Sequence, residues 1–413
     1  MRRLIKNCLS ALFLVVAMAS ADAATFSMKR GLNLDIWETW PQEESWGDPD
    51  VLLPYPEWRQ HLDEGDLAAL KAAGFDFLRM PVDPSPFLSD KTAGLRDQLV
   101  QSVVESARLI NEAGLKVVVD LHLIPAGGPR GPGMEEVMSD AAMFDRYVEL
   151  VRTIARALAK EDPALVALEV MNEPVVDCEG DGTNHWPDRL QRLYAAARAA
   201  ATRLTIVLSG ACYANADALA RVSPKAIPDN NIIWTFHSYE PFLLTHQGAT
   251  WAGDFIRYVT GLPYPLYSAP REELDAALET IRQRIRDEAP WARRAGMLDY
   301  LDEQVALMNT RKKHDALVEQ PFATVAKWAK RNRIKPENIL LGEFGMIRQE
   351  YGNPYVVPAR ERAAYVKDMI ERAEKHGFAW SIWDYGGAFG IVEEFEGKPA
   401  EPDVMEMVRD LPR

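Results

Sequence analysis

Short apolar runs alternate with longer amphipathic stretches along most of the chain. Eight of the runs are rich in Val, Ile, Leu, Phe and Trp and hold few polar residues. They are continuous rather than alternating, which is typical of strands buried on both faces of a parallel sheet. We therefore predict strands over residues 31–36, 75–82, 115–123, 164–173, 203–210, 231–239, 338–344 and 378–386.

The stretches between these runs have the spacing of amphipathic helices. Helices are predicted over residues 64–74, 96–114, 142–160, 188–200, 322–333 and 359–377. Three of them end on Gly74, Gly114 and Gly377, and the next apolar run follows at once. A glycine C-cap before a short loop is typical of repeated βα units, and eight such units close into a barrel. The sequence therefore predicts an α/β fold, the (β/α)₈ TIM barrel.

A doubly wound open sheet is the alternative arrangement of such units. The first run lacks the G-x-G-x-x-G turn of a dinucleotide site, which favours the barrel. No linker divides residues 24–413, so we expect a single domain with enlarged βα-loops. The largest insertion follows the sixth strand, from about residue 241 to 320, and carries a charged helical pattern over 271–294. It belongs to the carboxyl-terminal face of the barrel, where active sites lie.

The first residues have the layout of a secretory signal peptide. Basic side chains within the first six residues precede the apolar run 9–19, and the triplet A-D-A follows at 21–23. We predict a signal peptide over residues 1–23 and a secreted or periplasmic protein. A membrane anchor is the alternative, but the apolar run is shorter than the ~20 residues of a spanning helix.

Composition narrows the class of partner. The 413 residues are 47% hydrophobic and 26% charged, which is typical of a folded globular protein. The formal charge of −14 argues against nucleic acid or an anionic membrane as the main partner. No P-loop, G-x-S-x-G elbow or clustered Cys/His spacing occurs, so neither a cofactor nor a metal is expected. Cys178 and Cys212 remain after signal cleavage, and the sequence leaves open whether they form a disulfide or two free thiols.

Polar and aromatic side chains occupy the carboxyl-terminal ends of six predicted strands. They are Arg79, His122, Asn172, Glu173, His237, Tyr239, Glu343 and Trp383. Such ends line the active-site cup of a barrel, and burying these groups without partners would be costly. Taken alone, each has a structural alternative: an ion-pair partner, a core histidine or tryptophan, or a surface charge at a loop start. Their shared position favours one common site.

Four short motifs close the strands that carry these side chains. N-E-P ends the fourth strand, H-S-Y the sixth, G-E-F the seventh and a tryptophan the eighth. This set resembles glycoside hydrolase family 5, the cellulase family, over essentially the whole mature chain. The resemblance implies that Glu173 is the general acid/base and Glu343 the nucleophile of a retaining reaction. Retention requires the two carboxyl groups to lie about 5 to 5.5 Å apart.

The neighbours of the nucleophile have expected roles in this chemistry. Arg79 is expected to keep Glu343 charged, since an adjacent guanidinium favours the carboxylate form. Tyr239 is expected to donate a hydrogen bond to the same glutamate, and Asn172 to bind the sugar 2-hydroxyl.

The remaining side chains are expected to position the acid and the sugars. His237 is expected to orient or tune Glu173, and His122 to bind a hydroxyl of the sugar next to the scissile bond. Trp383 offers a flat apolar face on which a pyranose ring can stack.

Two loops offer further aromatic side chains. The first loop carries Trp37, Trp40, Trp46, Tyr55 and Trp58. These side chains either form further sugar-binding platforms or pack against one another within the loop. In the insertion after the sixth strand, the residues expected to form the other wall are His246, Gln247 and Trp251. A lid or a structural brace is the alternative for that insertion.

The sequence thus predicts a secreted O-glycosyl hydrolase that cleaves internal β-1,4-glucosidic bonds of a polysaccharide, as an endoglucanase does. Alternative substrates are β-mannan, mixed-linkage or β-1,3-glucan, and an exopolysaccharide of the producing cell. A noncatalytic carbohydrate-binding barrel is the alternative from another class, although it is expected to have lost one of the residues above. We expect a monomer that binds polysaccharide, with no nucleic acid and no membrane after signal cleavage.

Overall fold

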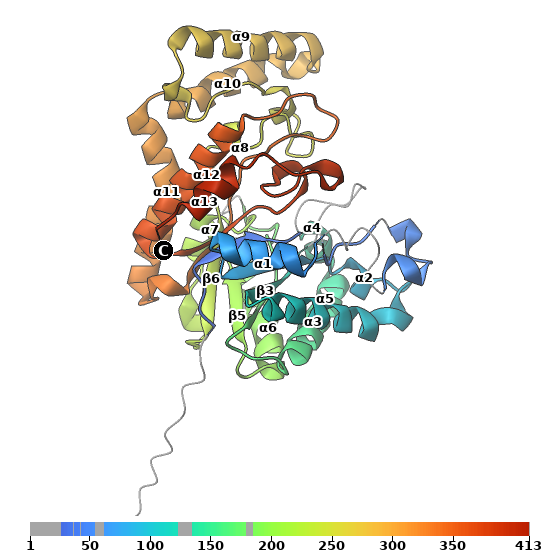
Figure 1. Ribbon diagram of the computed structural model, residues 1–413. Coiled ribbons are helices and arrows are strands. Elements are labelled where there is room, and N and C mark those ends of the chain that lie inside the picture. The colour runs from blue at the N-terminus through green and yellow to red at the C-terminus, as the bar shows by residue number, and fades with distance from the viewer. Residues whose placement is uncertain are drawn as a thin grey trace, which may run out of the picture.

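Eight parallel strands close into a barrel in the order in which they occur along the chain (Figure 1). The computed structural model describes residues 26–35, 37–41, 43–53, 62–122, 134–178 and 185–412. The strands are β1 (Arg30–Asn33), β2 (Phe77–Val82), β3 (Lys116–Leu121), β4 (Val166–Glu169), β5 (Thr205–Ser209), β6 (Ile232–His237), β7 (Ile339–Glu343) and β8 (Ala379–Ile382). The TIM barrel expected from the sequence is confirmed, whereas the predicted signal peptide lies outside the described residues.

An apolar layer fills the barrel below the site. It takes one inward side chain from each of seven strands, together with two residues that precede β1: Phe77, Val118, Ala167, Val207, Ile233, Leu340, Ala379, Phe26 and Met28. The remaining strand, β1, has Gly31 at this level, where a Cβ atom would collide with the ring of Phe77. Because strand side chains alternate between faces, the residues two positions later also point inward and form the next layer.

Helices surround the barrel and return the chain to the start of each strand. They are α1 (Glu64–Ala73), α2 (Ser85–Leu88), α3 (Arg96–Glu112), α4 (Glu135–Ser139), α5 (Ala141–Leu158), α6 (Trp186–Ala200), α7 (Ala216–Arg221), α8 (Phe242–Thr245), α9 (Arg271–Glu288), α10 (Arg294–Met308), α11 (Arg311–Asn332), α12 (Ala359–His376) and α13 (Asp403–Arg409). None of the helices in the described part of the chain is both long and apolar enough to cross a membrane.

The helix predicted over 322–333 starts earlier than expected. Helix α11 begins at Arg311 and continues through Pro321, with Thr310 as its N-cap. A proline inside a helix removes one backbone hydrogen bond, so a helix that continues through it needs support from packing. Burial of Val318, Phe322 and Val325 on one face of α11 stabilises the helix across this position.

The insertion after β6 carries a helical arm. The charged pattern over 271–294 divides near Pro290 into α9 and α10, which lie farther from the strands than the other helices (Figure 1). Only three side chains of α9 are buried, namely Leu278, Ile281 and Ile285. The arm therefore packs through one narrow apolar stripe, and most other residues of α9 are exposed.

The first aromatic loop is packed on itself and on the barrel helices. Trp37, Trp40 and Trp46 are buried, and the indole of Trp46 donates to the carbonyl of Pro41 at 2.8 Å. Trp40 meets the ring of Phe87 edge-on at 5.8 Å. The sugar-platform alternative is therefore wrong for these three tryptophans. Tyr55 and Trp58 lie outside the described residues.

Candidate active site

The side chains predicted from the strand ends gather at the carboxyl-terminal mouth of the barrel. Arg79 lies within β2, His237 and Glu343 end β6 and β7, and the others follow their strands directly or within four residues: His122, Asn172, Glu173, Tyr239 and Trp383. Strand β4 itself ends at Glu169, so Glu173 stands on the loop beyond it. The insertion between β6 and β7 therefore does not separate these residues in space.

Glu343 is held by side chains from two other strands. Its Oε1 accepts from Nη1 of Arg79 at 2.8 Å, and its Oε2 accepts from the hydroxyl of Tyr239 at 2.9 Å. The side chain of Glu343 is only 5% exposed. Both contacts expected from the sequence are present, and they fix both carboxylate oxygens.

Arg79 has more partners than the sequence indicated. Its guanidinium forms two hydrogen bonds with Glu169, at 2.8 and 3.0 Å, and an ion pair with Asp120 at 2.9 Å. It also donates to Asn33 at 2.9 Å and to Asn172 at 2.7 Å. Burial of three carboxylates around one cation is tolerated because every guanidinium nitrogen finds an oxygen.

The sequence prediction missed Asn33, Asp120 and Glu169. Each stands two positions after an inward apolar residue of its strand, so it belongs to the next inward layer. Burial raises the pKa of Asp120 to about 7 and also raises the pKa of Glu169. A carboxylate inside an otherwise apolar strand was the available signal, because such a group requires a buried cation.

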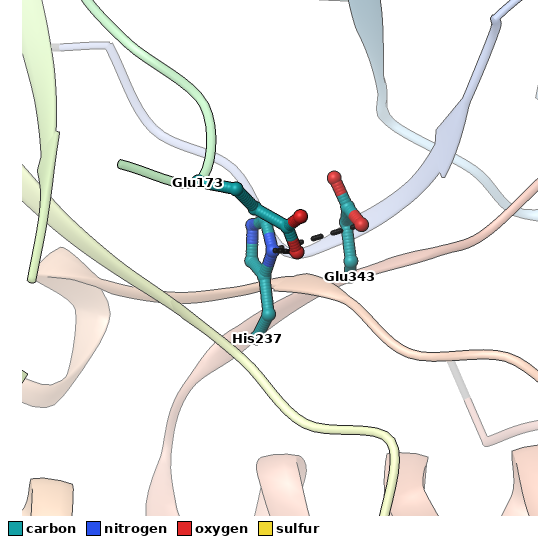
Figure 2. Close-up of side chains that lie close together, drawn as sticks. All are labelled: Glu173, His237 and Glu343. Carbon is teal, nitrogen blue, oxygen red and sulfur yellow. Dashed lines mark hydrogen bonds and ion pairs between the residues drawn. The ribbon is translucent and has the colours of Figure 1, made fainter. Parts of the chain in front are cut away.

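Glu173 has a different environment from Glu343. Its side chain is 20% exposed, and Oε1 lies 2.8 Å from Nδ1 of His237 (Figure 2). Burial raises the pKa of Glu173 to about 7 and lowers the pKa of His237 to about 4. At neutral pH the imidazole is therefore uncharged, and a substantial fraction of Glu173 retains its proton.

The two glutamates face each other across the mouth of the barrel. One carboxyl oxygen of Glu173 lies within 4.8 Å of one carboxyl oxygen of Glu343, and Nδ1 of His237 lies 3.6 Å from Glu343 Oε2 (Figure 2). A proton donor opposite an ion-paired carboxylate is the arrangement that glycoside hydrolysis needs. The same two glutamates and His237 also form a group with the spacing of metal ligands.

His122 and Trp383 form the floor beside Glu343. Nδ1 of His122 lies 2.8 Å from Oδ2 of Asp120, and its ring stacks on Trp383 with centroids 5.3 Å apart. His122 therefore covers one face of the indole, and Trp383 as a whole is partly buried. Asn172 uses Oδ1 for Arg79, while its buried Nδ2 has no hydrogen-bond partner among the described residues.

A left-handed turn after β5 supports the loop that carries Glu173. Cys212, Tyr213 and Ala214 all have positive φ angles, of 47°, 57° and 54°. This conformation is unfavourable for residues other than glycine, so surrounding contacts must hold it. The amides of Cys212 and Tyr213 donate to the backbone of the Glu173 loop at 3.1 and 3.3 Å, and the amide of His237 donates to Ala214 at 2.9 Å.

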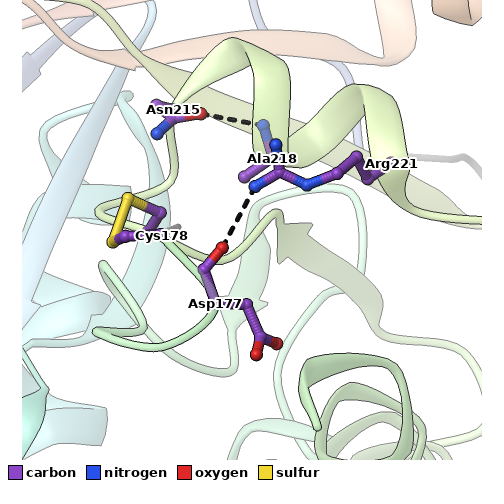
Figure 3. Close-up of a disulfide and its surroundings, with 6 residues drawn as sticks. Asp177, Cys178, Asn215, Ala218 and Arg221 are labelled. Carbon is purple, nitrogen blue, oxygen red and sulfur yellow. Dashed lines mark hydrogen bonds between the residues drawn. A yellow bond between two sulfur atoms is a disulfide. The ribbon is translucent and has the colours of Figure 1, made fainter. Parts of the chain in front are cut away.

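A disulfide also links this turn to the loop that carries Glu173. Cys178 and Cys212 are bonded, with Cα atoms 4.8 Å apart and a sequence separation of 34 (Figure 3). Arg221 donates to the carbonyl of Asp177 at 3.3 Å, and Asn215 caps the helix that carries this arginine (Figure 3). Of the two states that the sequence left open for the cysteines, the structure has the disulfide.

A pair of carboxyl groups lies next to the site, where β1 and β8 end. Asp35 and Asp384 hydrogen-bond each other. Burial raises the pKa of Asp35 to about 6 and raises the pKa of Asp384 well above its usual range. The sequence prediction did not include this pair.

The chain matches the family model described as cellulase (glycosyl hydrolase family 5) over residues 50–389. Endoglucanase C of Acetivibrio thermocellus is 22% identical over 387 residues, which cover 92% of this chain and 98% of that enzyme.

Two solved structures have a similar fold. One is the clostridial cellulose synthase subunit Z of Clostridioides difficile, with a TM-score of 0.62, 21% identity and coverage of 92% of this chain and 99% of that one. The other is Cel5A of Thermotoga maritima in complex with mannotriose, with a TM-score of 0.61, 20% identity and coverage of 92% and 97%. Because the family match spans most of the sequence, the chain belongs to glycosyl hydrolase family 5.

Proposed function

We propose that the protein is an endo-acting β-1,4-glucanase that works by retaining double displacement. Glu173 protonates the departing glycosidic oxygen, and Glu343 attacks the anomeric carbon to form a covalent glycosyl-enzyme. Glu173, now a carboxylate, then takes a proton from the water that cleaves this intermediate.

The distance between the two glutamates carries this proposal. Oxygens within 4.8 Å of each other fit a retaining enzyme, since an inverting one needs about 6.5–9.5 Å to admit a water. Glu343 is anchored by Arg79 and Tyr239 and so presents a fixed carboxylate to the sugar. Glu173 has the raised pKa that an acid catalyst requires.

The choice of β-1,4-glucan rests on the relatives. The curated protein reported above is named an endoglucanase, and the solved barrel from Clostridioides difficile is named a cellulose synthase subunit. The Cel5A complex with mannotriose makes β-mannan the second candidate substrate. These relatives are only 20–22% identical to the chain, so the polysaccharide has to be measured.

Export to the periplasm or the medium is part of the same proposal. The signal-like residues 1–23 and the disulfide between Cys178 and Cys212 both fit an oxidising compartment. Fractionation of cells that make the full chain, with the mass of the mature protein, tests this point. A full-length chain retained in the cytoplasm contradicts it.

A reducing-sugar assay tests the activity. The purified protein is incubated with carboxymethyl cellulose, barley β-glucan, lichenan, glucomannan and mannan, and Glu173→Ala and Glu343→Ala serve as controls. We expect the fastest release from the β-1,4-glucans, and almost none from either variant.

The other outcomes separate the alternatives. Faster release from mannan replaces the glucanase proposal by a mannanase. No release from any polymer, by a folded protein that still binds one of them, supports a noncatalytic carbohydrate-binding barrel.

A further inference from the structure

Glu169 holds the arginine that binds Glu343. Both carboxylate oxygens of Glu169 accept from Arg79, from Nε at 2.8 Å and from Nη2 at 3.0 Å. Nη1 of the same guanidinium donates to Oε1 of Glu343 at 2.8 Å. The side chains of Glu169 and Arg79 are fully buried. One edge of the guanidinium therefore faces Glu169, and the nitrogen outside that edge binds Glu343.

The ionisable side chains packed around Arg79 and Glu343 come from four other strands or from the segments that follow them. They are Asp120, His122, Glu169, Glu173, His237, Tyr239 and Asp384. Within this cluster, Arg79 alone carries a permanent positive charge. Its counter-charge therefore comes from carboxylates, and Glu169 accepts two of its hydrogen bonds where Glu343 accepts one.

The contact with Arg79 favours the charged form of Glu169. Burial raises the pKa of Glu169, and the adjacent guanidinium opposes this shift. Two parallel hydrogen bonds from a guanidinium are the geometry of an ionised carboxylate, since both oxygens then act as acceptors. A buried arginine is in turn costly to leave without a counter-ion. Glu169 and Arg79 therefore form a buried ion pair within the barrel.

Other buried polar side chains near the site have structural partners. Gln247 pairs with the backbone of Leu262, donating at 2.8 Å and accepting at 2.8 Å, and so closes the loop that follows α8. Gln247 and His246 are buried, contrary to the wall expected from the sequence, and only Trp251 of that set is exposed. Glu169 differs from Gln247, because its side-chain partner is the arginine that binds the nucleophile.

We propose that Glu169 is a positioning residue, which acts as the permanent counter-ion of Arg79 and thereby sets how strongly Arg79 stabilises the charge of Glu343. The inference rests on the proposed retaining mechanism and adds a residue to it. Because Glu169 is fully buried, it does not reach the sugar and acts through Arg79.

The charge of Glu343 changes in each catalytic cycle, whereas the charge of Arg79 does not. Attack converts the carboxylate of Glu343 into a neutral glycosyl ester, and hydrolysis of the ester restores the carboxylate. While Glu343 is an ester, Glu169 and Asp120 still compensate the buried guanidinium. While Glu343 is a carboxylate, the same two residues limit how strongly Arg79 stabilises it. Stabilisation of the attacking charge that is lost in the transition state slows the attack.

Glu169→Gln removes the counter-charge and keeps the size of the side chain. Arg79 then stabilises the carboxylate of Glu343 more strongly, so attack on the sugar should slow by about tenfold. Hydrolysis of the glycosyl-enzyme should keep its rate or become faster, because a better stabilised carboxylate is a better leaving group. A slower first step with an unimpaired second step is the expected signature of the lost charge.

A 2-deoxy-2-fluoro β-glycoside with a dinitrophenyl leaving group separates the two steps. Its sugar is the disaccharide that the wild-type protein releases, and its fluorine makes the glycosyl-enzyme long-lived. The rate of inactivation measures attack by Glu343, and this leaving group needs no proton from Glu173. The rate at which activity returns after removal of the reagent measures hydrolysis of the ester.

Three further variants control for structure. Glu169→Asp keeps the charge and should recover most of the rate of attack. Asp120→Asn removes the other buried counter-charge and should act in the same direction as Glu169→Gln, but less strongly, because burial raises the pKa of Asp120 to about 7. Glu374→Gln breaks an ion pair with Arg30 at the opposite end of the barrel and should change neither step. Thermal unfolding checks that each variant is folded.

The outcomes distinguish this inference from the proposed function. Slower attack together with slower hydrolysis in Glu169→Gln overturns the inference, because a displaced Arg79 impairs both steps. Equal rates in Glu169→Gln and the wild type overturn it as well, and if Glu169→Gln does not fold, Asp120→Asn decides between the same outcomes. None of these results affects the proposed function, which fails only if the wild-type protein is not labelled by the reagent and hydrolyses none of the polymers.

Discussion

Glu173 and Glu343 stand on one barrel rim, but the chain holds them in different ways. Glu343 ends a strand, and buried side chains of Arg79 and Tyr239 bind both of its oxygens. Glu173 lies on a loop, has a φ of 38°, and has His237 as its side-chain partner. One glutamate is thus fixed by polar side chains of the barrel, and the other by the backbone of its loop.

This difference suits the two chemical roles that we propose for these residues. A nucleophile gains from a fixed, ion-paired carboxylate, whereas an acid/base must change its protonation state twice in each cycle. The low exposure of Glu343 and its ion pair with Arg79 fit the role of nucleophile. The raised pKa of Glu173 fits the role of acid/base.

Loss of the nucleophile should have the largest effect. Glu343→Ala is expected to reduce kcat by roughly 10⁴-fold or more, as for other groups that form a covalent intermediate. Polysaccharide binding should persist, because binding depends on the rest of the cleft. Initial-rate kinetics and calorimetry on the same preparation measure both quantities. Glu371→Ala, at an exposed position of α12, is the control and should behave like the wild type. Activity close to normal in Glu343→Ala would exclude the assigned nucleophile.

Loss of the acid should depend on the leaving group. Glu173→Ala is expected to lower kcat/KM on polysaccharide by about 10²–10⁴-fold, the usual range for general acid–base catalysis. On an aryl glycoside with an acidic phenol the fall in kcat/KM should be much smaller, because that leaving group needs no proton. Azide should then restore turnover, since it attacks the glycosyl-enzyme without a general base. An equal loss on both substrates would argue against Glu173 as the acid.

The pH profile provides an independent measure of the same residue. The pKa of Glu173 is raised to about 7, so its proton is present below that pH and is lost as the pH rises through it. Polysaccharide hydrolysis by the wild type should therefore decline above about pH 7. The decline should be weaker for the activated aryl glycoside, and an identical alkaline limb for both substrates would contradict the assignment.

The two glutamates also differ in how much of their surroundings could be predicted from the sequence. Strands and their order followed from continuous apolar runs and glycine-capped helices, because these signals are local. The partners of Glu343 followed from strand ends, since these meet at one rim in a closed barrel. Asp120 and Glu169 were missed although the alternation of strand side chains places them in the layer directly above the apolar one. Reading every second residue of each run, and not only its last, would have found them.

The turn and the disulfide that hold the Glu173 loop could not be predicted from the sequence. The left-handed turn over 212–214 involves no glycine, so no residue type marks it in the sequence. The disulfide depends on the separation of two loops in space, which sequence spacing does not give. Features built from long-range contacts between loops need coordinates, whereas features repeated in every βα unit do not.

Removal of the disulfide should have the smallest effect on catalysis, and it tests whether the loop positions the acid. Cys178→Ser with Cys212→Ser should lower the free energy of unfolding by ~4 kcal/mol, given the sequence separation of 34 between the cysteines. The kcat on polysaccharide should fall by roughly tenfold or less, as expected for a displaced catalytic group, with a smaller fall on the activated aryl glycoside. Reversible reduction of the wild-type protein gives the same comparison without a substitution.

The ratio of the two rates separates positioning from general stability. If the disulfide only stabilises the fold, both substrates lose activity in the same proportion, and lowering the assay temperature restores both. If the disulfide positions Glu173, the loss of activity on polysaccharide persists at temperatures where the variant is fully folded. The reason is that only the step that needs a proton from Glu173 is slowed. Azide rescue should then be partial in the disulfide variant and larger in Glu173→Ala, since only the latter lacks the base. A uniform loss would mean that the turn and its hydrogen bonds hold the acid without help from the disulfide.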